Sequence, residues 1–425
     1  MRFSRIKNFN IRDYLVCLFI CWPVFYSLWS EMRVTVNIFS GFPVLLLYLM
    51  VLLSVILFRK VYVNISFVWL LFYLVTLITI WKANRPVYIR DLSIGLSAWI
   101  ICNTVGKRNV RIEIIVKWLI RIGVFVCLTV IIESVFGVFK GILKDIIYSE
   151  RVLSMLQQRR EQGNSGIFTY SSIAGCFIYP GFFAYVISKR IRNKRYWFTV
   201  LIFVLSMLLI SKRGFIIDTL ICFLFLFFIE RKAKGKLNIS LRKMKRIVSS
   251  IVLLIIIAIV LYTCIPLIRS AVNGLLYKFY NDDSTLSGRT YLYARALQLF
   301  KDNPVLGIGW GNFRGESLYV LSKYSAKTYE THNVYLQLLC ENGIIGLLSF
   351  LSATISVLVY TCKRLLTSYR INAVSHRSEA LRLSILLQMF FITYCMSGNP
   401  LYDNIFVITY YFGILMLGVN EEQAL

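Results

Sequence analysis

Histidine is nearly absent from this chain of 425 residues, which has only His332 and His376. Acidic side chains are also scarce, with 20 Asp and Glu against 48 Lys and Arg. The two longest polar segments have no Asp-x-Asp motif and a single adjacent acidic pair, Asp282-Asp283. An enzyme that uses a metal ion and a nucleotide sugar is therefore disfavoured, because such a metal needs clustered oxygen ligands.

Paired cysteines are missing as well. The chain has 10 cysteines, mostly inside apolar stretches, with no Cys-x-x-Cys pair. A disulfide framework or a zinc site is disfavoured, and the cysteines are interpreted as small apolar core residues. A cleavable signal sequence is not indicated either, because Arg12 and Asp13 precede the first apolar block and no small-residue cleavage pattern follows it. We expect this block to remain as the first membrane span.

Apolar residues are abundant, at 58% of the chain with a mean hydropathy of +0.69. They form long blocks without the alternation of half-buried strands or the polar stripe of soluble helices, which predicts an all-α polytopic membrane protein with about 12 transmembrane helices. Aromatic residues at 15% fit helix ends anchored at the membrane interface. The expected spans are 14–29, 38–58, 64–81, 91–105, 114–138, 166–188, 196–211, 214–230, 247–268, 334–361, 383–398 and 403–419.

The net charge of +28 is spread over short basic clusters between these blocks, so the clusters are topology signals and no nucleic-acid partner is expected. With a cytoplasmic N-terminus, Lys and Arg are about twice as dense in the inside segments as in the outside ones. We therefore expect a protein of the bacterial cytoplasmic (inner) membrane with both termini in the cytoplasm. Its basic runs contact membrane lipid.

Two segments assigned to the outside are too long for simple connectors, 139–165 and 269–333. The chain is accordingly divided into spans one to nine (1–268), a large periplasmic loop (269–333) and the last three spans (334–425). Within the loop, 288–304 has apolar residues at helical spacing and then Asn303-Pro304, which predicts an amphipathic helix and its end. A glycine-rich turn follows at 307–316. It only superficially resembles a phosphate loop, because no strand precedes it.

Few side chains in these segments and in the short turns between spans have the chemistry for a reaction. His332 ends the large loop just before a span, where a lone histidine is either solvated or catalytic. Arg213, in the sequence SKRG, lies in the very short turn between two apolar blocks. A guanidinium near the membrane needs an anion or an acidic partner, or else extends to the interface. Arginine also suits a diphosphate, because its planar donors stay charged.

The sequences GRTYLYARALQLFKDNPVLGIGWGNF and THNVYLQLLCENGIIGLLSF resemble the O-antigen polymerase and O-antigen ligase superfamily of bacterial polysaccharide assembly. The resemblance covers about Ser287 to Phe350. It combines an Arg-headed amphipathic helix, an NPxxGxGxGNF turn, HNxYLQ, and ExGxxGLL entering a span. SKRG and NSGIFTYSSIAG are similar to weaker family landmarks.

The resemblance implies a GT-C-like membrane glycosyltransferase that moves a saccharide from undecaprenyl diphosphate onto an acceptor hydroxyl at the periplasmic face, without metal or other cofactor. By the same resemblance, His332 is the general base and Arg213 and Arg289 hold the diphosphate. The remaining substrate-binding candidates, for diphosphate or glycan, are Arg159, Arg160, Arg314 and Asn333, and the choice between the first two stays open. A chain-length regulator protein is a further partner that the resemblance admits.

Three functions remain open at this point. A polymerase transfers the lipid-linked glycan to another lipid-linked repeat unit, whereas a ligase transfers it to the lipid A core oligosaccharide. The segment GNPLYDN at 398–404 favours the polymerase. A transporter of lipid-linked sugars is the third candidate, and it would place charged residues along a central cavity within the spans, where few occur.

Overall fold

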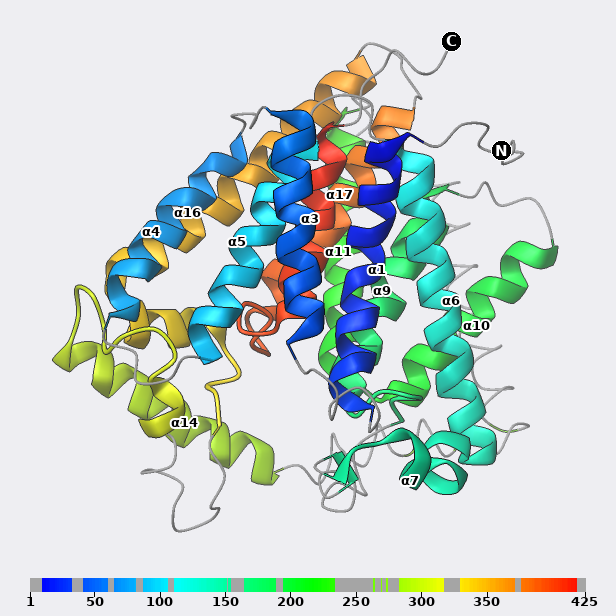
Figure 1. Ribbon diagram of the computed structural model, residues 1–425, viewed down its shortest axis with the longest axis horizontal. Helices are drawn as coiled ribbons and strands as arrows, with labels where there is room; N and C mark the ends of the chain where they lie inside the picture. The colour runs from blue at the N-terminus through cyan, green and yellow to red at the C-terminus, as the bar shows by residue number, and fades with distance from the viewer. Residues whose placement is uncertain are drawn as a thin grey trace, which may run out of the picture.

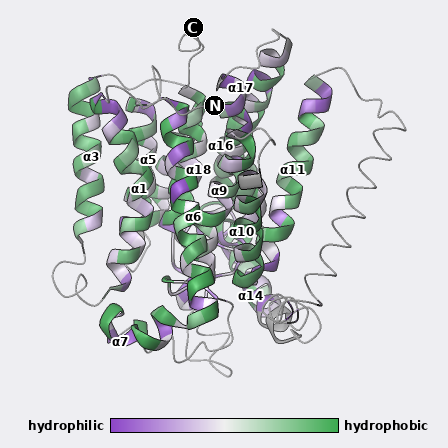
Figure 2. Cartoon of the chain, turned by 90° about the vertical axis from the view of Figure 1, so that its right-hand side faces the viewer, coloured by the Kyte–Doolittle hydropathy of each residue, from purple (hydrophilic) through white to green (hydrophobic). Residues whose placement is uncertain are grey.

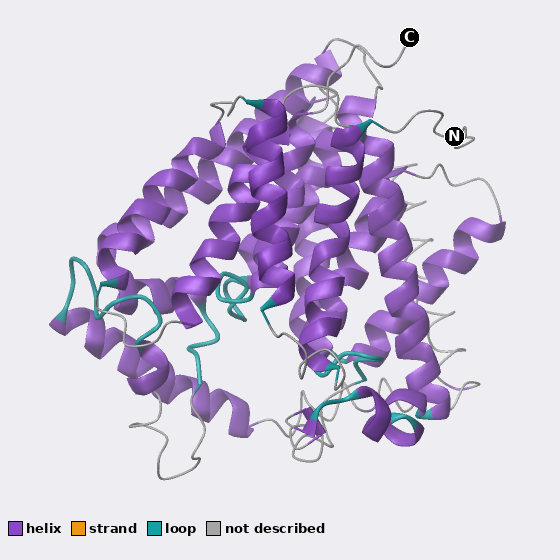
Figure 3. Ribbon diagram, in the orientation of Figure 1, coloured by secondary structure: helices purple, strands orange, loops and turns teal. Residues whose placement is uncertain are grey.

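The computed structural model describes residues 10–32, 41–59, 65–81, 87–105, 111–150, 152–153, 164–188, 194–233, 263, 269, 273, 283–316, 329–370 and 376–418. Regular secondary structure in these residues is helical (Figure 3), apart from one isolated bridge between Met32 and Tyr148. The expected all-α class is confirmed for this part of the chain.

Eleven of the twelve expected spans coincide with helices, and the twelfth, 247–268, lies outside the described residues except for residue 263. The helices are α1 (Ile11–Glu31), α3 (Phe42–Phe58), α4 (Val68–Ile80), α5 (Val87–Val105), α6 (Ile112–Phe136), α9 (Ser171–Ser188), α10 (Lys194–Ile210), α11 (Arg213–Ala233), α16 (Val334–Arg370), α17 (His376–Tyr394) and α18 (Asn404–Leu415). Within the described residues, α1, α6, α9 and α16 are long and apolar enough to cross a membrane, and the other apolar helices are shorter or less apolar.

The bundle is apolar outside as well as inside. Leu52 of α3, Ile78 of α4 and Phe228 of α11 are 54%, 62% and 63% exposed. Helices such as α3 and α11 are largely hydrophobic along their length and more hydrophilic near their ends (Figure 2). A helix that is apolar all round, with part of that surface exposed, fits lipid contact. The chain is therefore a multi-pass membrane protein.

Aromatic residues join helices from both halves of the sequence in the core. The Trp69 ring lies 5.8 Å from Phe350 and 5.3 Å from Tyr410, and these side chains are buried. The hydroxyls of Tyr73 and Tyr411 are hydrogen-bonded at 2.6 Å. Such pairs satisfy polar groups that would otherwise be stranded in an apolar interior, and they fix α4 against α16 and α18.

Two helices lie across one end of the bundle, α14 (Asp283–Asp302) and the short α7 (Lys144–Ile147) (Figure 1). The start of α1 and the end of α18 lie at the opposite end. The predicted helix over 288–304 is confirmed, and it ends before Asn303-Pro304 as expected. The described helices of the two long polar segments therefore share one end of the molecule.

The structure differs from the expected segment 166–188 at its start, because residues 166–170 form a turn and α9 begins at Ser171. The turn is held by side chains: Ser165 Oγ donates to the carbonyl of Phe168, and the carboxylate of Glu31 accepts from the amide of Thr169 at 3.0 Å. Such competing polar contacts are invisible to an average of hydrophobicity.

Candidate functional site

The glycine-rich turn after α14 is bonded to the first part of α16. The amide of Ile308 donates to the carbonyl of Cys340 at 2.9 Å, and that of Gly309 to Glu341 at 2.8 Å. In return, Ile344 N–H donates to the Pro304 carbonyl at 2.9 Å. These bonds close around a kink in α16 at Gly343, whose φ and ψ are 66° and −168°.

Two glycines make this approach feasible. Gly307 and Gly343 both have positive φ, 65° and 66°, which disfavours any residue with a Cβ. A Cβ on Gly307 would also overlap the backbone of Glu341, and one on Gly343 would overlap Val305. The turn and the kink therefore form one interlocked unit.

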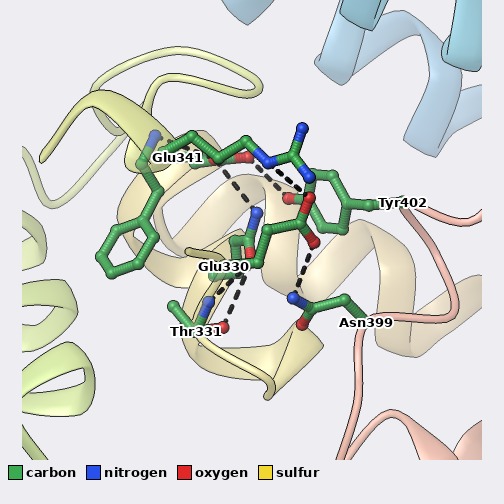
Figure 4. Close-up of polar contacts among 8 residues, drawn as sticks. Glu330, Thr331, Glu341, Asn399 and Tyr402 are labelled. Carbon is green, nitrogen blue, oxygen red and sulfur yellow. Dashed lines mark hydrogen bonds and ion pairs between the residues drawn. The ribbon is translucent and has the colours of Figure 1, made fainter. Parts of the chain in front are cut away.

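The buried carboxylate of Glu341 lies inside this unit (Figure 4). It accepts from the amide of Phe313 at 3.1 Å, from the hydroxyl of Tyr402 at 2.6 Å and from Gln337 Nε2 at 3.3 Å. The ring of Tyr402 also stacks on Trp310 at 4.3 Å between centroids. The donors of the turn thus face an internal carboxylate, so its glycines have a structural role here.

Glu330 anchors the loop segment that leads to His332 (Figure 4). Its carboxylate pairs with Arg314 Nε at 3.0 Å and accepts from Asn399 Nδ2 at 2.7 Å. Burial raises the pKa of Glu330 to about 7, although the charge of Arg314 and the bond from Asn399 oppose the shift. The loop is therefore tied both to the glycine-rich turn and to the segment 398–404 before α18.

His332 sits between this anchored loop and α16. Its φ of 55° is in the left-handed region, which is uncommon for a residue other than glycine. The neighbouring Asn333 side chain accepts from the amide of Leu336, which caps α16. Val334 N–H donates to the carbonyl of Cys395 at 2.9 Å, so the start of α16 lies beside the end of α17.

Arg289 approaches His332 from α14. It lies on the helical face that also carries Leu292, Ala296 and Leu299, at spacings of three, four and three residues. These apolar residues are buried in one cluster with Phe313 and Cys340, so this face is directed toward α16.

Lys212, just before α11, also acts on His332, and Arg213 is the first residue of that helix. Ser211, before them, also has a left-handed φ of 55°. A Cβ on Gly214 would lie 3.1 Å from Ser397 Oγ, so this turn lies beside the residues that follow α17. Burial and then the charges of Arg289 and Lys212 lower the pKa of His332 to about 4. A neutral imidazole therefore lies among cationic side chains from two other elements.

In the structure the charge of Arg289 acts on His332, and Arg213 is the first residue of α11. Arg314 is paired with Glu330, and Asn333 caps a helix. Arg159 and Arg160 lie outside the described residues. No group of three or more His, Cys, Asp or Glu able to hold a metal occurs within the described ranges.

Sequence reasoning missed Lys212, although it belongs to the SKRG motif, and it gave no role to Glu330, Glu341 or Asn399. The signal that could have indicated them was their position inside or next to the motifs that resemble the family. Glu341 and Tyr402 are 61 residues apart in the sequence, and Glu330 and Asn399 are 69 apart. A single sequence does not reveal such pairs.

A family model described as O-Antigen ligase matches residues 197–351, which include Lys212, Arg213, Arg289, Arg314 and His332. The chain is also similar to the exopolysaccharide production protein ExoQ of Rhizobium meliloti (strain 1021), with 29% identity over 101 residues. That match covers 21% of this chain and 22% of the relative, so it spans about a fifth of the relative's length. The match to the O-antigen ligase family therefore covers residues 197–351, and the resemblance to the O-antigen polymerase and ligase superfamily is confirmed.

Proposed function

We propose that this protein is a membrane glycosyltransferase of bacterial surface polysaccharide assembly, which polymerises saccharide repeat units carried on undecaprenyl diphosphate at the periplasmic face of the inner membrane. The observation that carries the proposal is that the charges of Arg289 and Lys212 act on His332 inside the family-matched segment, with Arg213 next to Lys212. One proton acceptor among cations suits a reaction with an anionic leaving group.

In the proposed reaction, the acceptor hydroxyl oxygen bonds to the anomeric carbon of the donor sugar. The bond from that carbon to the diphosphate breaks, and its electron pair leaves on the diphosphate. The hydroxyl proton passes to the neutral imidazole of His332. Arg289 and Arg213 hold the diphosphate and stabilise the charge that develops on it, because fixed guanidinium groups need no reorganisation during the step.

The neutral state of His332 supports its role as a base. With a pKa near 4, the imidazole is unprotonated throughout the neutral range and can accept a proton. Its position is fixed on both sides, by Glu330 with Arg314 and Asn399, and by the cap that Asn333 makes on α16. A base that is held in this way loses little entropy in reaching the acceptor.

The second candidate is a ligase that transfers the same glycan to the lipid A core. The description of the matched family as O-Antigen ligase supports it, whereas the similarity to an exopolysaccharide production protein and the segment 398–404 support the polymerase. For either enzyme, the donor and the site chemistry are the same.

Deletion of the gene, followed by analysis of the surface glycolipids, tests the proposal and separates the two enzymes. We expect surface glycans that stop at a single repeat unit, as for a polymerase. Core lipopolysaccharide without any repeat would instead indicate the ligase. An unchanged glycan profile together with no accumulated lipid-linked saccharide would contradict both.

A further inference from the structure

Large apolar side chains are exposed at the end of α6 and in the segment that follows it. Val135 and Phe136, the last residues of α6, are 52% and 68% exposed, and Ile142 and Ile146 are 73% and 71% exposed. The two isoleucines belong to the expected outer loop 139–165. Apolar side chains that gather on a surface in this way mark a site of contact with a membrane or with another protein.

The chain turns where α6 ends and then runs across the end of the bundle. Gly137, with a left-handed φ of 60°, ends α6, and the short π-helix η2 (Val138–Ile142) and α7 follow it (Figure 1). Because α6 has 25 residues, it is about 37 Å long, whereas the hydrocarbon core of a bilayer is about 30 Å thick. A membrane-spanning α6 therefore ends at the membrane interface, and the segment after the turn lies at that depth.

The backbone of this segment is largely satisfied without water. The carboxylate of Glu133 accepts from the amide of Phe139 at 2.6 Å and from that of Lys140 at 3.2 Å. Main-chain bonds engage the amides of Gly141, Ile142, Leu143, Ile146, Ile147 and Tyr148. Paired amides lower the cost of leaving water, so the segment is suited to the poorly hydrated boundary between headgroups and acyl chains.

The charged side chains of the segment are compatible with the same position. The ammonium of Lys140 donates to Ser165 Oγ and is therefore bound within the protein. Lys144 and Asp145 are exposed. At the headgroup boundary such charges stay hydrated while neighbouring apolar side chains enter the acyl region.

The segment is fixed to the rest of the protein at its far end as well. The hydroxyl of the buried Tyr148 donates to the carbonyl of Ile167 at 2.7 Å, and Tyr148 also forms the bridge with Met32. The next amide, of Ser149, donates to the carbonyl of Glu31 at 3.2 Å. With both ends held in this way, Ile142 and Ile146 are kept on the outer surface.

We propose that residues 138–147 form an interfacial anchor, in which Ile142 and Ile146 insert among the lipids of the leaflet at the α7 end. In the proposed orientation this is the outer leaflet. The occupant is lipid because the exposed apolar surface continues from Ile132, Val135 and Phe136 of α6, a helix long and apolar enough to cross the membrane. The anchor goes beyond the proposed function and does not depend on it.

The anchor is connected to the region of the candidate site. Ser165, the partner of Lys140, follows Asn164, whose amide donates to the carbonyl of Leu209 at 3.1 Å near the end of α10. Arg213 begins the next helix, four residues after Leu209. Insertion of the anchor therefore helps to set the depth of the turn between α10 and α11 relative to the lipid headgroups.

Site-specific fluorine NMR measures the depth of the segment. We suggest the full-length protein in nanodiscs, with trifluoromethyl-phenylalanine at the position of Ile142 or Ile146, one at a time. A nitroxide on the acyl chain near the headgroup should broaden both signals, and an aqueous gadolinium chelate should not. The same probe in place of Leu52, exposed on the span α3, is the lipid control, and in place of Lys301, exposed on α14, it is the water control.

Two results of this measurement would overturn the proposal. Broadening by the gadolinium chelate as strong as at Lys301 would place the segment in water. Protection of Ile142 and Ile146 from both reagents would assign the surface to a protein contact, such as a second copy of the chain.

A variant tests whether the inserted side chains hold the segment in place. Ile142→Asp combined with Ile146→Asp should speed amide hydrogen exchange in 139–148 by about tenfold or more, because the apolar contact with lipid is lost. Lys144→Gln, which changes an exposed charge in the same segment, is the matched control and should keep the wild-type rates. Equal exchange in the two variants would overturn the anchoring role.

Exchange in α9 reports whether the double variant keeps its fold, and wild-type protection is expected there. If α9 also loses protection, the fluorine measurement decides, since it leaves both charges and fold as they are. Neither measurement requires glycan transfer, so failure of the anchor and failure of the proposed function are distinguishable.

Discussion

His332 combines a strained backbone, fixed neighbours and a depressed pKa at one position. Left-handed φ values at residues other than glycine cost about 1–3 kcal/mol and persist only where the surroundings hold them. Here the surroundings are the bonds of Glu330 and Thr331 on one side and the Asn333 cap on the other. Substitution of His332 is therefore a direct test of the proposed chemistry.

Removal of the imidazole should abolish the chemical step. His332→Ala should lower kcat by about 10²–10⁴-fold, the range expected for loss of a general base, with little change in the donor KM. The control is His376→Ala, at the start of α17, which should retain wild-type kcat. Purified variants assayed with lipid-linked glycan give both constants, and substantial kcat in His332→Ala would refute its role as the base.

The pH dependence follows from the lowered pKa of His332. In the free enzyme the base is unprotonated above about pH 4, so kcat/KM should be flat through neutrality and fall only as pH drops through about 4. Initial rates at low donor concentration give this profile. A fall in kcat/KM that begins near the ordinary pKa of histidine, about 6.5, would contradict the lowered pKa of His332.

His332, Arg213 and Arg289 were selected from the scarcity of histidine and the family motif together, and their roles stay predictions. The effect of Lys212 on the pKa of His332 was not predictable, because the two residues are over a hundred positions apart in the sequence. Arg314 and Asn333 illustrate the reverse case. Their residue types suit a substrate, but the structure gives them a partner within the protein.

At the scale of elements, the interlocked turn and kink position both His332 and Arg289. Gly307→Ala should destabilise this unit by about 2–4 kcal/mol, because it combines a left-handed backbone with overlap against Glu341. Gly315→Ala lies in the same turn, has open space around its Cβ position, and should be tolerated. Thermal unfolding in detergent compares them, and equal Tm values would show that the close approach is unimportant.

Hydrophobic block length predicted the helices well, because a membrane span must be long and apolar. The kink at Gly343 could not be predicted in this way, because it depends on the backbone of Val305 filling the space of a missing side chain. The start of α9 was misplaced for a similar reason, since Glu31 holds Thr169 in a turn from 138 residues away.

For the whole molecule, the placement of α14 and α7 at one end and of the α1 start and α18 end at the other is compatible with the expected topology. We predict that Lys301→Cys, on α14, reacts with a membrane-impermeant maleimide in intact cells. Lys363→Cys, exposed in the last turns of α16, should react only after the inner membrane is permeabilised. The reverse labelling pattern would invert the proposed orientation, and the wild-type protein controls for labelling of native cysteines.

The central claim is that this protein alone transfers a glycan from a lipid diphosphate, and reconstitution tests it most directly. The purified protein would be placed in liposomes with undecaprenyl-diphosphate-linked repeat units as both donor and acceptor, in the presence of a chelator and without nucleotide sugar. The account predicts glycans of more than one repeat, with one undecaprenyl diphosphate released per bond formed. No transfer to lipid-linked repeats or to lipid A core, by protein that remains folded, would contradict it.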